Sequence, residues 1–515
     1  MRHYSFRLFT GLLVLYVTAC APSSNDQQAV NSGSVAPERL FLQQISSHSA
    51  IVKWRGNSQV ACWSPRINGL ESGRCEQGSL TEGNHWEILL NGLVPDTEYL
   101  YSVGGYANAK LRFRTAPVTG QLPGDDSVHI WIVGDSGTES AKVDHGHSNK
   151  GKAAKTLAGY QHYRAANNSK PTDLMLMLGD NAYTEGTDEQ WQVAVFDVFA
   201  DVLSQTALYS TIGNHEMGAG VIKAEYLSEK YPALVGDFKG DLWIGGVSTS
   251  SDANSYATAE DKTPRRIPYL DILTLPSNAE LGGKPSNTEQ YYSFNYGNVH
   301  VISLDSQLSA RDKHQRLAMR KWLVGDLLNN RLDWTIVIFH HPVYTKGSHD
   351  SDEAAASRMG IDQPIIDMRR EFTSVFEDYG VDLVFSGHSH SYERSWYLQG
   401  HRGDASSFNA VQHTELNTEG LPAIGYGEEA YQQLSISSQQ DDKVVYTVAG
   451  SSGHVSMADG KLDHPAHAIQ KNDPRQRHGL AEQGSVVVDA SSNQLIARFI
   501  NEKGAVLDTV VIQRD

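Results

Sequence analysis

Residues 174–183 read Leu-Met-Leu-Met-Leu-Gly-Asp-Asn-Ala-Tyr, and this stretch decides the fold. A short, uninterrupted apolar run that stops at a glycine is typical of a strand in a sheet covered on both faces. Gly179 lets the chain turn sharply and present the side chain of Asp180 at the carboxyl end of the strand. In layered α/β folds, ligands bind beyond that end. The stretch therefore predicts a buried strand that delivers a carboxylate to a binding site.

Similar runs recur along the chain. Strand-like segments cover residues 129–133, 299–304, 334–339 and 381–385, and helical spacing covers residues 189–203 and 314–329. This alternation predicts a layered α/β domain. Four more ligand-bearing motifs occur in order with that of Asp180: Gly134-Asp135-Ser136-Gly137, Gly213-Asn214-His215-Glu216, His340-His341-Pro342-Val343-Tyr344 and Gly387-His388-Ser389-His390. Together they offer enough carboxylate, amide and imidazole ligands for two metal ions.

The ordered set of motifs resembles the metallophosphoesterase superfamily, and within it the purple acid phosphatases, over about residues 128 to 455. Asp135-Ser136-Gly137 stands where many relatives carry Asp-x-His, so one imidazole is absent. The second motif extends to Tyr183, whose phenolate can replace that imidazole and suits Fe(III). The segment 291–300 also resembles the family. The resemblance implies an α/β layered metallophosphoesterase domain, a β-sandwich flanked by helices.

The resemblance further implies two metal sites that share Asp180. The ferric-type ion would be held by Asp135, Asp180, Tyr183 and His390. The second ion, which could be Fe, Zn or Mn, would be held by Asp180, Asn214, His340 and His388. In the family pattern the ligand is followed by one residue and then by proline, which leaves His341 as a neighbour of the site.

By the same resemblance, the chain is a phosphatase that hydrolyses phosphomonoesters with a metal-activated hydroxide. Two metal ions about 3.5–4 Å apart would clamp a phosphate oxygen and lower the pKa of a bound water. His215 is the candidate for phosphate contact or general acid, and His349 is a second substrate-facing histidine. Glu216 is expected to be a supporting carboxylate rather than a ligand.

Three other functions stay open at this point. A phosphodiesterase or nucleotide hydrolase on the same metal site would differ only in how its pocket treats the second ester group. A non-catalytic surface binding protein would retain the site as a relic, although all seven ligand positions are filled. A single-metal lyase or oxygenase is disfavoured because seven ligand positions are too many for one ion.

The composition narrows the choice of partners. The formal net charge of −17 over 515 residues argues against general nucleic-acid binding, which needs a positive surface. A phosphorylated small molecule or nucleotide remains a suitable substrate, because bound metal ions dominate the local field. The oligomeric state cannot be read from the sequence.

The N-terminus has the features of an export signal. Arg2 and Arg7 precede an apolar run that is too short to span a bilayer, and residues 1–19 are expected to be a signal peptide. Val17-Thr18-Ala19-Cys20 resembles a bacterial lipobox, which would make Cys20 the lipidated, membrane-anchored first residue of a protein of the bacterial cell envelope. A plain signal peptide is the alternative. Two further cysteines, Cys62 and Cys75, then form an even pair outside the cytosol, and a disulfide between them is expected.

The rest of the chain divides into a tether and two domains. Residues 20–36 are poor in apolar side chains and predict a flexible tether. Residues 37–117 alternate as short strands and resemble a fibronectin type III-like sandwich, with Tyr99 or Tyr101 as its corner tyrosine. The catalytic domain is expected over residues 125–515. Within it, the polar segments 218–288 and 401–440 are interpreted as long loops or insertions near the site.

Three further polar features lie outside the five ligand motifs. Asp144-His145-Gly146-His147 looks like a ligand cluster but lies outside the ordered set, and a solvated loop is the preferred interpretation. His454 follows a strand-like run and could line the cleft. Asp305 ends another strand-like run and could simply cap the next turn.

Overall fold

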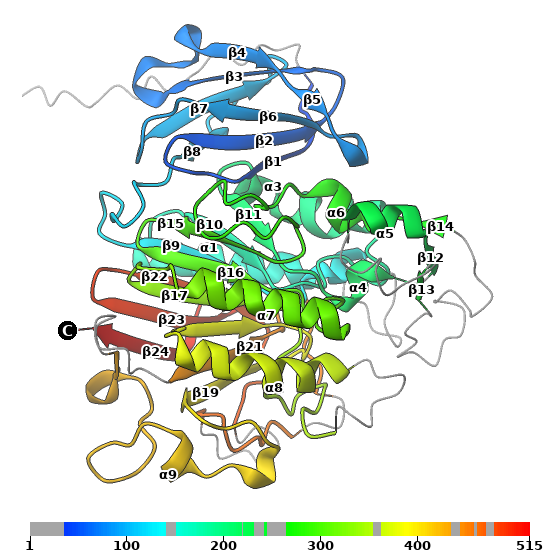
Figure 1. The fold of residues 1–515 in the computed structure, drawn as a ribbon. Coiled ribbons are helices and arrows are strands. Elements are labelled where there is room, and N and C mark those ends of the chain that lie inside the picture. The colour runs from blue at the N-terminus through cyan, green and yellow to red at the C-terminus, as the bar shows by residue number, and fades with distance from the viewer. Residues whose placement is uncertain are drawn as a thin grey trace, which may run out of the picture.

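The computed structural model describes residues 35–140, 151–218, 220–230, 242–244, 264–353, 362–433, 443–457, 461–469 and 478–514. A small all-β module is followed by a larger body of sheets and helices, and the two are packed together (Figure 1). The predicted signal peptide and lipobox lie outside the described residues. Among the residues described, no helix is long and apolar enough to cross a membrane.

The module is a sandwich of two small sheets. One has the strand order β4-β3-β7-β8, and the other contributes β1-β2-β6-β5. The strands are β1 (Glu38–Gln43), β2 (Ser49–Arg55), β3 (Val60–Pro65), β4 (Arg74–Gln77), β5 (Ser79–Leu80), β6 (Trp86–Asn91), β7 (Glu98–Val103) and β8 (Arg112–Arg114). This confirms the small all-β sandwich expected from the sequence.

Two predicted details of the module are also present. The backbone N–H of Val94 donates to the hydroxyl of Tyr99 over 2.9 Å, so Tyr99 is the corner tyrosine. The hydroxyl of Tyr101 instead donates to the carbonyl of Ser204 in the larger body. Cys62 and Cys75 are directly paired across β3 and β4 and form a disulfide, which confirms the expected bridge.

The larger body is built around two large sheets. One follows the order β20-β24-β23-β22-β9-β10-β11 and then continues into β1 of the module. Its strands are β9 (Val128–Val133), β10 (Leu174–Met177), β11 (Ala207–Ser210), β20 (Tyr431–Gln433), β22 (Gly484–Ala490), β23 (Gln494–Asn501) and β24 (Val506–Arg514). The other has the order β15-β16-β17-β18-β21-β19. Its strands are β15 (Tyr292–Tyr296), β16 (Val299–Ser303), β17 (Trp334–Ile338), β18 (Leu383–Ser386), β19 (Tyr392–Leu398) and β21 (Val444–Ala449).

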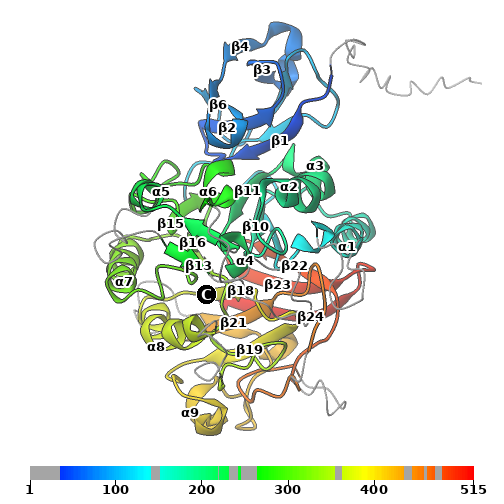
Figure 2. The same ribbon diagram turned by 90° about the vertical axis from the view of Figure 1, so that its right-hand side faces the viewer.

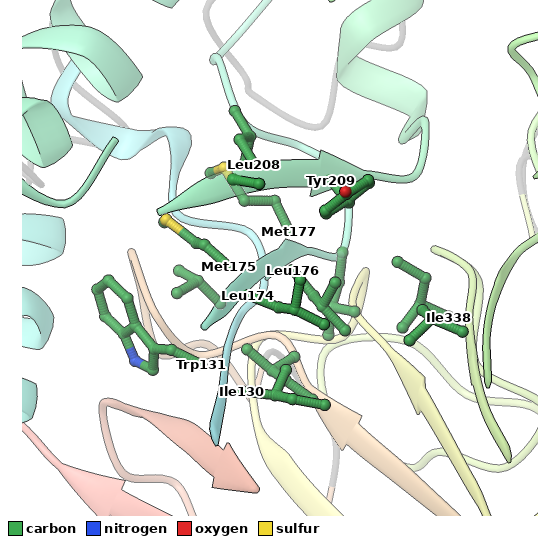
Figure 3. Close-up of a cluster of buried hydrophobic side chains, with 14 of the residues drawn as sticks. Ile130, Trp131, Leu174, Met175, Leu176, Met177, Leu208, Tyr209 and Ile338 are labelled. Carbon is green, nitrogen blue, oxygen red and sulfur yellow. The ribbon is translucent and has the colours of Figure 1, made fainter. Parts of the chain in front are cut away.

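The continuous apolar strands are explained by burial on both faces. In β17, Ile336 and Ile338 belong to the core between the two sheets, whereas Val337 packs among residues of the helices. Figure 3 shows Ile338 with Ile130 and Leu174 of the opposite sheet in this core. Every second side chain of a strand faces the other sheet and the rest face helices, so no polar face is needed.

Helices cover the outer faces of the sandwich (Figures 1 and 2). α1 packs against β22 and β23, and α7 and α8 share an apolar cluster with the outer face of β17. The helices are α1 (Lys152–Asn167), α2 (Asp188–Trp191), α3 (Asp197–Leu203), α4 (Asn214–Met217), α5 (Ala224–Lys230), α6 (Pro268–Ile272), α7 (Lys313–Leu327), α8 (Gln363–Asp378) and α9 (Ala410–His413). The helix predicted over residues 189–203 is real, but a π-helical turn at Gln192–Phe196 joins α2 to α3.

The two predicted insertions have little regular structure in their described parts. Between residues 218 and 288 these parts hold α5, α6 and a small sheet of β12 (Gly220–Ile222), β13 (Leu242–Ile244) and β14 (Pro264–Arg265). The segment from 401 to 433 carries the single-turn helix α9 and ends in β20. The insertions therefore add mostly irregular chain to the sandwich.

Candidate metal centre

Three of the predicted ligands follow strands and have an unusual backbone. Asp135 follows β9, Asp180 follows β10 and His388 follows β18, with φ of 54°, 53° and 67° respectively. Residues other than glycine rarely adopt this left-handed conformation, and where they do, the surrounding structure enforces it. The shared strain turns each side chain away from its strand and toward a common region.

Glycines permit the close approach of these loops. A Cβ atom at Gly387 would collide with Oδ2 of Asp135, and one at Gly213 would collide with Oδ1 of Asp180. The backbone N–H of His388 can in turn donate to the carboxylate of Asp135 over 2.9 Å. The motifs therefore need glycine because carboxylates of other motifs occupy the space that a side chain would fill.

One cluster of donor atoms surrounds the phenol of Tyr183. Its hydroxyl lies 3.3 Å from Oδ1 of Asp135 and 3.2 Å from Oδ2 of Asp180. It also lies 3.0 Å from Nε2 of His390, which is itself 3.5 Å from Oδ1 of Asp135. The structure thus brings together all four residues assigned to the ferric-type ion.

A second cluster surrounds the amide oxygen of Asn214, at the start of α4. Nε2 of His340 lies 3.0 Å from this oxygen, and Nδ1 of His388 lies 2.9 Å from it. Nε2 of His340 also lies 3.3 Å from Oδ2 of Asp180. Asp180, His340 and His388 each place one ligand atom within 4.8 Å of the others. Asp180 therefore belongs to both clusters.

The spacing of the donor atoms fits metal ions. Ligands bound at about 2.0–2.2 Å to one ion lie roughly 3 Å apart, as these do. Burial and then the charges of Asp180 and Asp135 raise the pKa of the Tyr183 phenol well above its ordinary value. A phenolate at this position therefore requires a cation beside it. Mixed carboxylate, phenol, amide and imidazole donors suit Fe, Zn or Mn.

Histidine charge in the second cluster depends on its neighbours. Burial lowers the pKa of His340, but the negative charge of Asp180 outweighs burial and raises this pKa to about 9. Burial and then the positive charge of His349 lower the pKa of His388 to about 3. The Nδ1–H of His340 donates to the carbonyl of Leu178 over 2.8 Å, which leaves Nε2 as the atom that faces Asn214. This arrangement orients Nε2 as a ligand atom.

Glu216 supports the loops and does not enter either cluster. Its buried carboxylate accepts hydrogen bonds from the backbone N–H groups of Asp180, Asn181 and Gly213 at 2.6–2.9 Å. Burial and then the charge of Asp180 raise the pKa of Glu216 to about 7. The carboxylate ties the second and third motifs together, as the sequence predicts for a supporting residue.

His215 lies beside the first cluster. Its ring centroid is 4.5 Å from that of Tyr183, and its Nδ1–H donates to the carbonyl of Thr184 over 2.7 Å. The backbone N–H of His215 donates to Oδ1 of Asp180. With Nδ1 engaged, Nε2 is the atom available for a substrate.

His349 lies beside the second cluster, and it reveals a residue that sequence reasoning missed. Its ring stacks on that of His388 with centroids 3.8 Å apart. Oδ1 of Asp362 lies 2.9 Å from Nδ1 of His349 and 2.9 Å from Nε2 of His388. Asp362 directly precedes α8, where an aspartate before Gln-Pro looks like an ordinary helix start. No ligand-type spacing marked it.

The remaining polar candidates have separate positions. His341 is buried, and its Nδ1 lies 2.9 Å from the hydroxyl of Ser306, outside both donor clusters. Asp305 accepts from the backbone N–H groups that follow it and so caps that turn. The ring of His454 lies 5.6 Å from that of His390, beside the first cluster. The segment 144–147 lies outside the described residues.

Similarity to known proteins agrees with this geometry. Residues 128–392 match the family model of the calcineurin-like phosphoesterases. Purple acid phosphatase 15 of Arabidopsis thaliana is 27% identical over 374 residues, which cover 70% of this chain and 56% of that protein. Phosphoenolpyruvate phosphatase of Allium cepa is 24% identical over 88% of this chain and 82% of its own length.

Solved structures share the fold. The purple acid phosphatase PPD1 from yellow lupin seeds superposes with a TM-score of 0.58 at 17% identity, over 93% of this chain and 75% of that chain. The family match spans more than half of the chain and includes all five ligand motifs, and its relatives support a hydrolase of phosphoric esters. The chain belongs to the calcineurin-like phosphoesterase family.

Proposed function

We propose that the chain is a phosphomonoesterase of the purple acid phosphatase type with a dinuclear metal centre. The observation that carries the proposal is the convergence of two donor clusters on the shared carboxylate of Asp180. Two ions held there would polarise a phosphoryl oxygen and lower the pKa of a water molecule to near neutrality. Fe(III) beside Tyr183, with Fe, Zn or Mn in the other cluster, fits the donors.

The imidazoles beside the clusters supply the remaining chemistry. His215 and His349 are both partly exposed, and one lies beside each donor cluster. Nε2 of His215 can hydrogen-bond a phosphoryl oxygen, because its Nδ1 is held by the carbonyl of Thr184. Either ring, when protonated, can give a proton to the leaving alcohol oxygen.

A comparison of two substrates with the same leaving group tests this proposal. The purified protein, loaded with iron and zinc, is given p-nitrophenyl phosphate and bis-p-nitrophenyl phosphate. We expect a kcat/KM at least about tenfold higher for the monoester, and a loss of about 100-fold or more on Asn214→Ala. A clear preference for the diester would replace the proposal with a phosphodiesterase, and no hydrolysis of either ester would overturn it.

We also propose that the protein is exported and anchored to the bacterial cell envelope through lipid on Cys20. The support is the charged front, short apolar run and lipobox-like end of residues 1–20. In cells fed a labelled fatty acid, the wild-type chain should carry label and sediment with membranes. The Cys20→Ser variant should carry none; equal label in both would contradict the anchor.

A further inference from the structure

We propose that the all-β module is a positioning element of the metal centre, acting through Arg39 and Arg55. Both arginines bind Asp188, which ends a short stretch of chain that begins at Tyr183. This stretch, residues 183–188, is called the brace turn below. The proposal rests on the function proposed above for the role of Tyr183, but the contacts themselves do not depend on it.

Asp188 receives two arginines from the module. Arg39 of β1 donates to both carboxylate oxygens at 2.8 Å and to the backbone carbonyl of Asp188 at 2.6 Å. Arg55 of β2 donates to the same two oxygens at 2.8 and 2.6 Å. Paired contacts of this kind fix direction as well as distance. The first turn of α2 is therefore held in position by the module, which lies against α2 and α3 in Figure 2.

The buried side chain and the left-handed backbone of Arg39 are both energetically unfavourable, yet the fold contains them. Its side chain is 1% exposed, and its backbone lies in the left-handed region with φ of 52°, where the register between β1 and β2 shifts. Its guanidinium also lies over the ring of Phe196 and donates to Gln192. A buried cation on a strained backbone persists only where the surrounding contacts enforce it.

The brace turn transmits this position to the metal ligands. Oε1 of Gln190 accepts from the backbone N–H groups of Glu185 and Thr187, so the turn is tied to α2. The carbonyl of Thr184 accepts from Nδ1–H of His215. Gly186 packs so closely on residues 215 and 216 that a Cβ atom there would lie 2.6 Å from Cα of Glu216. One short turn thus connects Asp188 to the phenol ligand and to the substrate-facing imidazole.

A second connection runs through the sheet. β1 pairs in parallel with β11, with Leu42 opposite Ala207, and β11 leads directly into the loop of Asn214. The backbone N–H of Thr274 donates to Oε1 of Gln43, which adds another anchor between module and body. The module therefore contacts both Asp188, at the end of the brace turn, and β11, the strand that precedes Asn214.

A matched control exists in the same interface. Lys110 of the module pairs with Asp201 of α3 at 2.6 Å, but both side chains are 60% exposed, and no hydrogen bond or ion pair between described residues joins either of them to the brace turn. If the arginines only join the module to the larger body, Lys110→Ala and Arg55→Ala should differ from each other in stability alone. If the arginines position the brace turn, only the arginine variants should alter the brace turn.

The experiment compares four full-length variants with the wild type: Arg55→Ala, Arg39→Ala with Arg55→Ala, Arg39→Lys with Arg55→Lys, and Lys110→Ala. Hydrogen exchange is followed in peptides that cover residues 182–190 and, as an internal reference, β16 to β18. The kcat and KM for p-nitrophenyl phosphate are measured on the same samples. Arg55→Ala keeps the contacts of Arg39 and remains informative if the double alanine variant does not fold.

We expect exchange in residues 182–190 to quicken about tenfold in the arginine-to-alanine variants, with the reference strands unchanged, because the turn loses its outer contact. The kcat should fall about tenfold with KM within twofold, since displaced catalytic groups lower the rate more than binding. The double lysine variant should recover part of both effects, and Lys110→Ala should show neither.

Unchanged exchange in residues 182–190, or equal acceleration in every peptide, would overturn the proposal. A wild-type chain that hydrolyses no phosphomonoester would instead count against the proposed function, while the exchange comparison would still decide whether the arginines hold the turn.

Discussion

The phenol oxygen of Tyr183 lies 3.0 Å from Nε2 of His390, although the two residues are 207 positions apart in the chain. The same oxygen is within 3.3 Å of the carboxylates of Asp135 and Asp180. A phenol among two carboxylates and an imidazole is expensive to ionise unless a cation is present. The contact places the phenol of Tyr183 among the donors where the family resemblance expects it to replace the histidine that Asp135-Ser136-Gly137 lacks.

Replacing Tyr183 with phenylalanine should remove one ligand while keeping the ring against His215. We expect the variant, purified with iron, to bind about one ion fewer per chain and to lose the broad visible absorption that an Fe(III)–phenolate pair gives. Elemental analysis and a visible spectrum of the same sample measure both. A variant that keeps its full metal content and the same band would contradict the assignment of Tyr183 as a ligand.

The ligand clusters could be predicted from sequence because most of the ligand motifs directly follow a recognisable strand-like run. Asp135, Asp180 and His388 follow apolar runs, and parallel strands bring their carboxyl ends together. The glycines beside them mark where side chains from other motifs need the space. Here the local sequence pattern and the long-range packing indicate the same ligand positions, so these positions can be predicted from the pattern.

Asp362 and Arg39 could not be predicted because their roles depend on contacts distant in sequence. Asp362 is 26 residues from His388, in a context that reads as an ordinary start of a helix. Arg39 meets Asp188 across 149 residues, and the pairing of β1 with β11 joins two sheets that the pattern predicts as separate domains. Neither contact leaves a periodic or compositional signal.

Replacing Asp362 with asparagine should impair the second cluster. The carboxylate lies 2.9 Å from both His349 and His388, and the amide retains the shape but not the charge. Loss of a carboxylate that orients a metal-bound histidine typically reduces metal affinity or activity about 10- to 100-fold. We expect a kcat at least about tenfold lower and faster loss of one ion on dialysis against a chelator.

Asp367→Asn is the control for this change. Asp367 lies on the same helix, accepts from Gln363 and lies 3.4 Å from Arg316, away from both histidines. Its substitution should leave kcat and metal retention within about twofold, because its partners are Gln363 and Arg316 rather than the two histidines. Equal effects of the two substitutions would show that α8, and not the shared contact of Asp362, is responsible.

The disulfide between Cys62 and Cys75 should stabilise the module without affecting the reaction. The bridge joins residues 13 positions apart on neighbouring strands and lies in the four-stranded sheet, which does not pair with β11. Closing a loop of this size stabilises by about 3 kcal/mol in the chain-entropy model. The double variant Cys62→Ser with Cys75→Ser should unfold at lower urea concentration, with kcat at 25 °C unchanged. No shift in the urea midpoint, or a matching fall in kcat, would contradict this.

His85 should make the junction between module and body sensitive to acid. Its side chain is fully buried near Phe41 and Phe196, and neither ring nitrogen has a hydrogen-bond partner among the described residues. Burial, followed by the positive charges of Arg55 and Lys53, lowers the pKa of His85 to about 3. Its pKa in the unfolded chain is about 6.5, so between these values only the unfolded chain binds the proton.

This difference fixes the sign of the pH dependence. The contribution of His85 to stability is fully present above about pH 6.5 and is lost progressively as the pH falls toward 3, with about 2 kcal/mol lost at pH 5. His85→Leu fills a similar volume and cannot be protonated. We expect urea midpoints measured from pH 7.5 to pH 5 to fall more steeply for the wild type than for His85→Leu. Parallel midpoints in the two proteins would show that His85 is not held neutral by its burial, since the leucine variant retains every other titrating group.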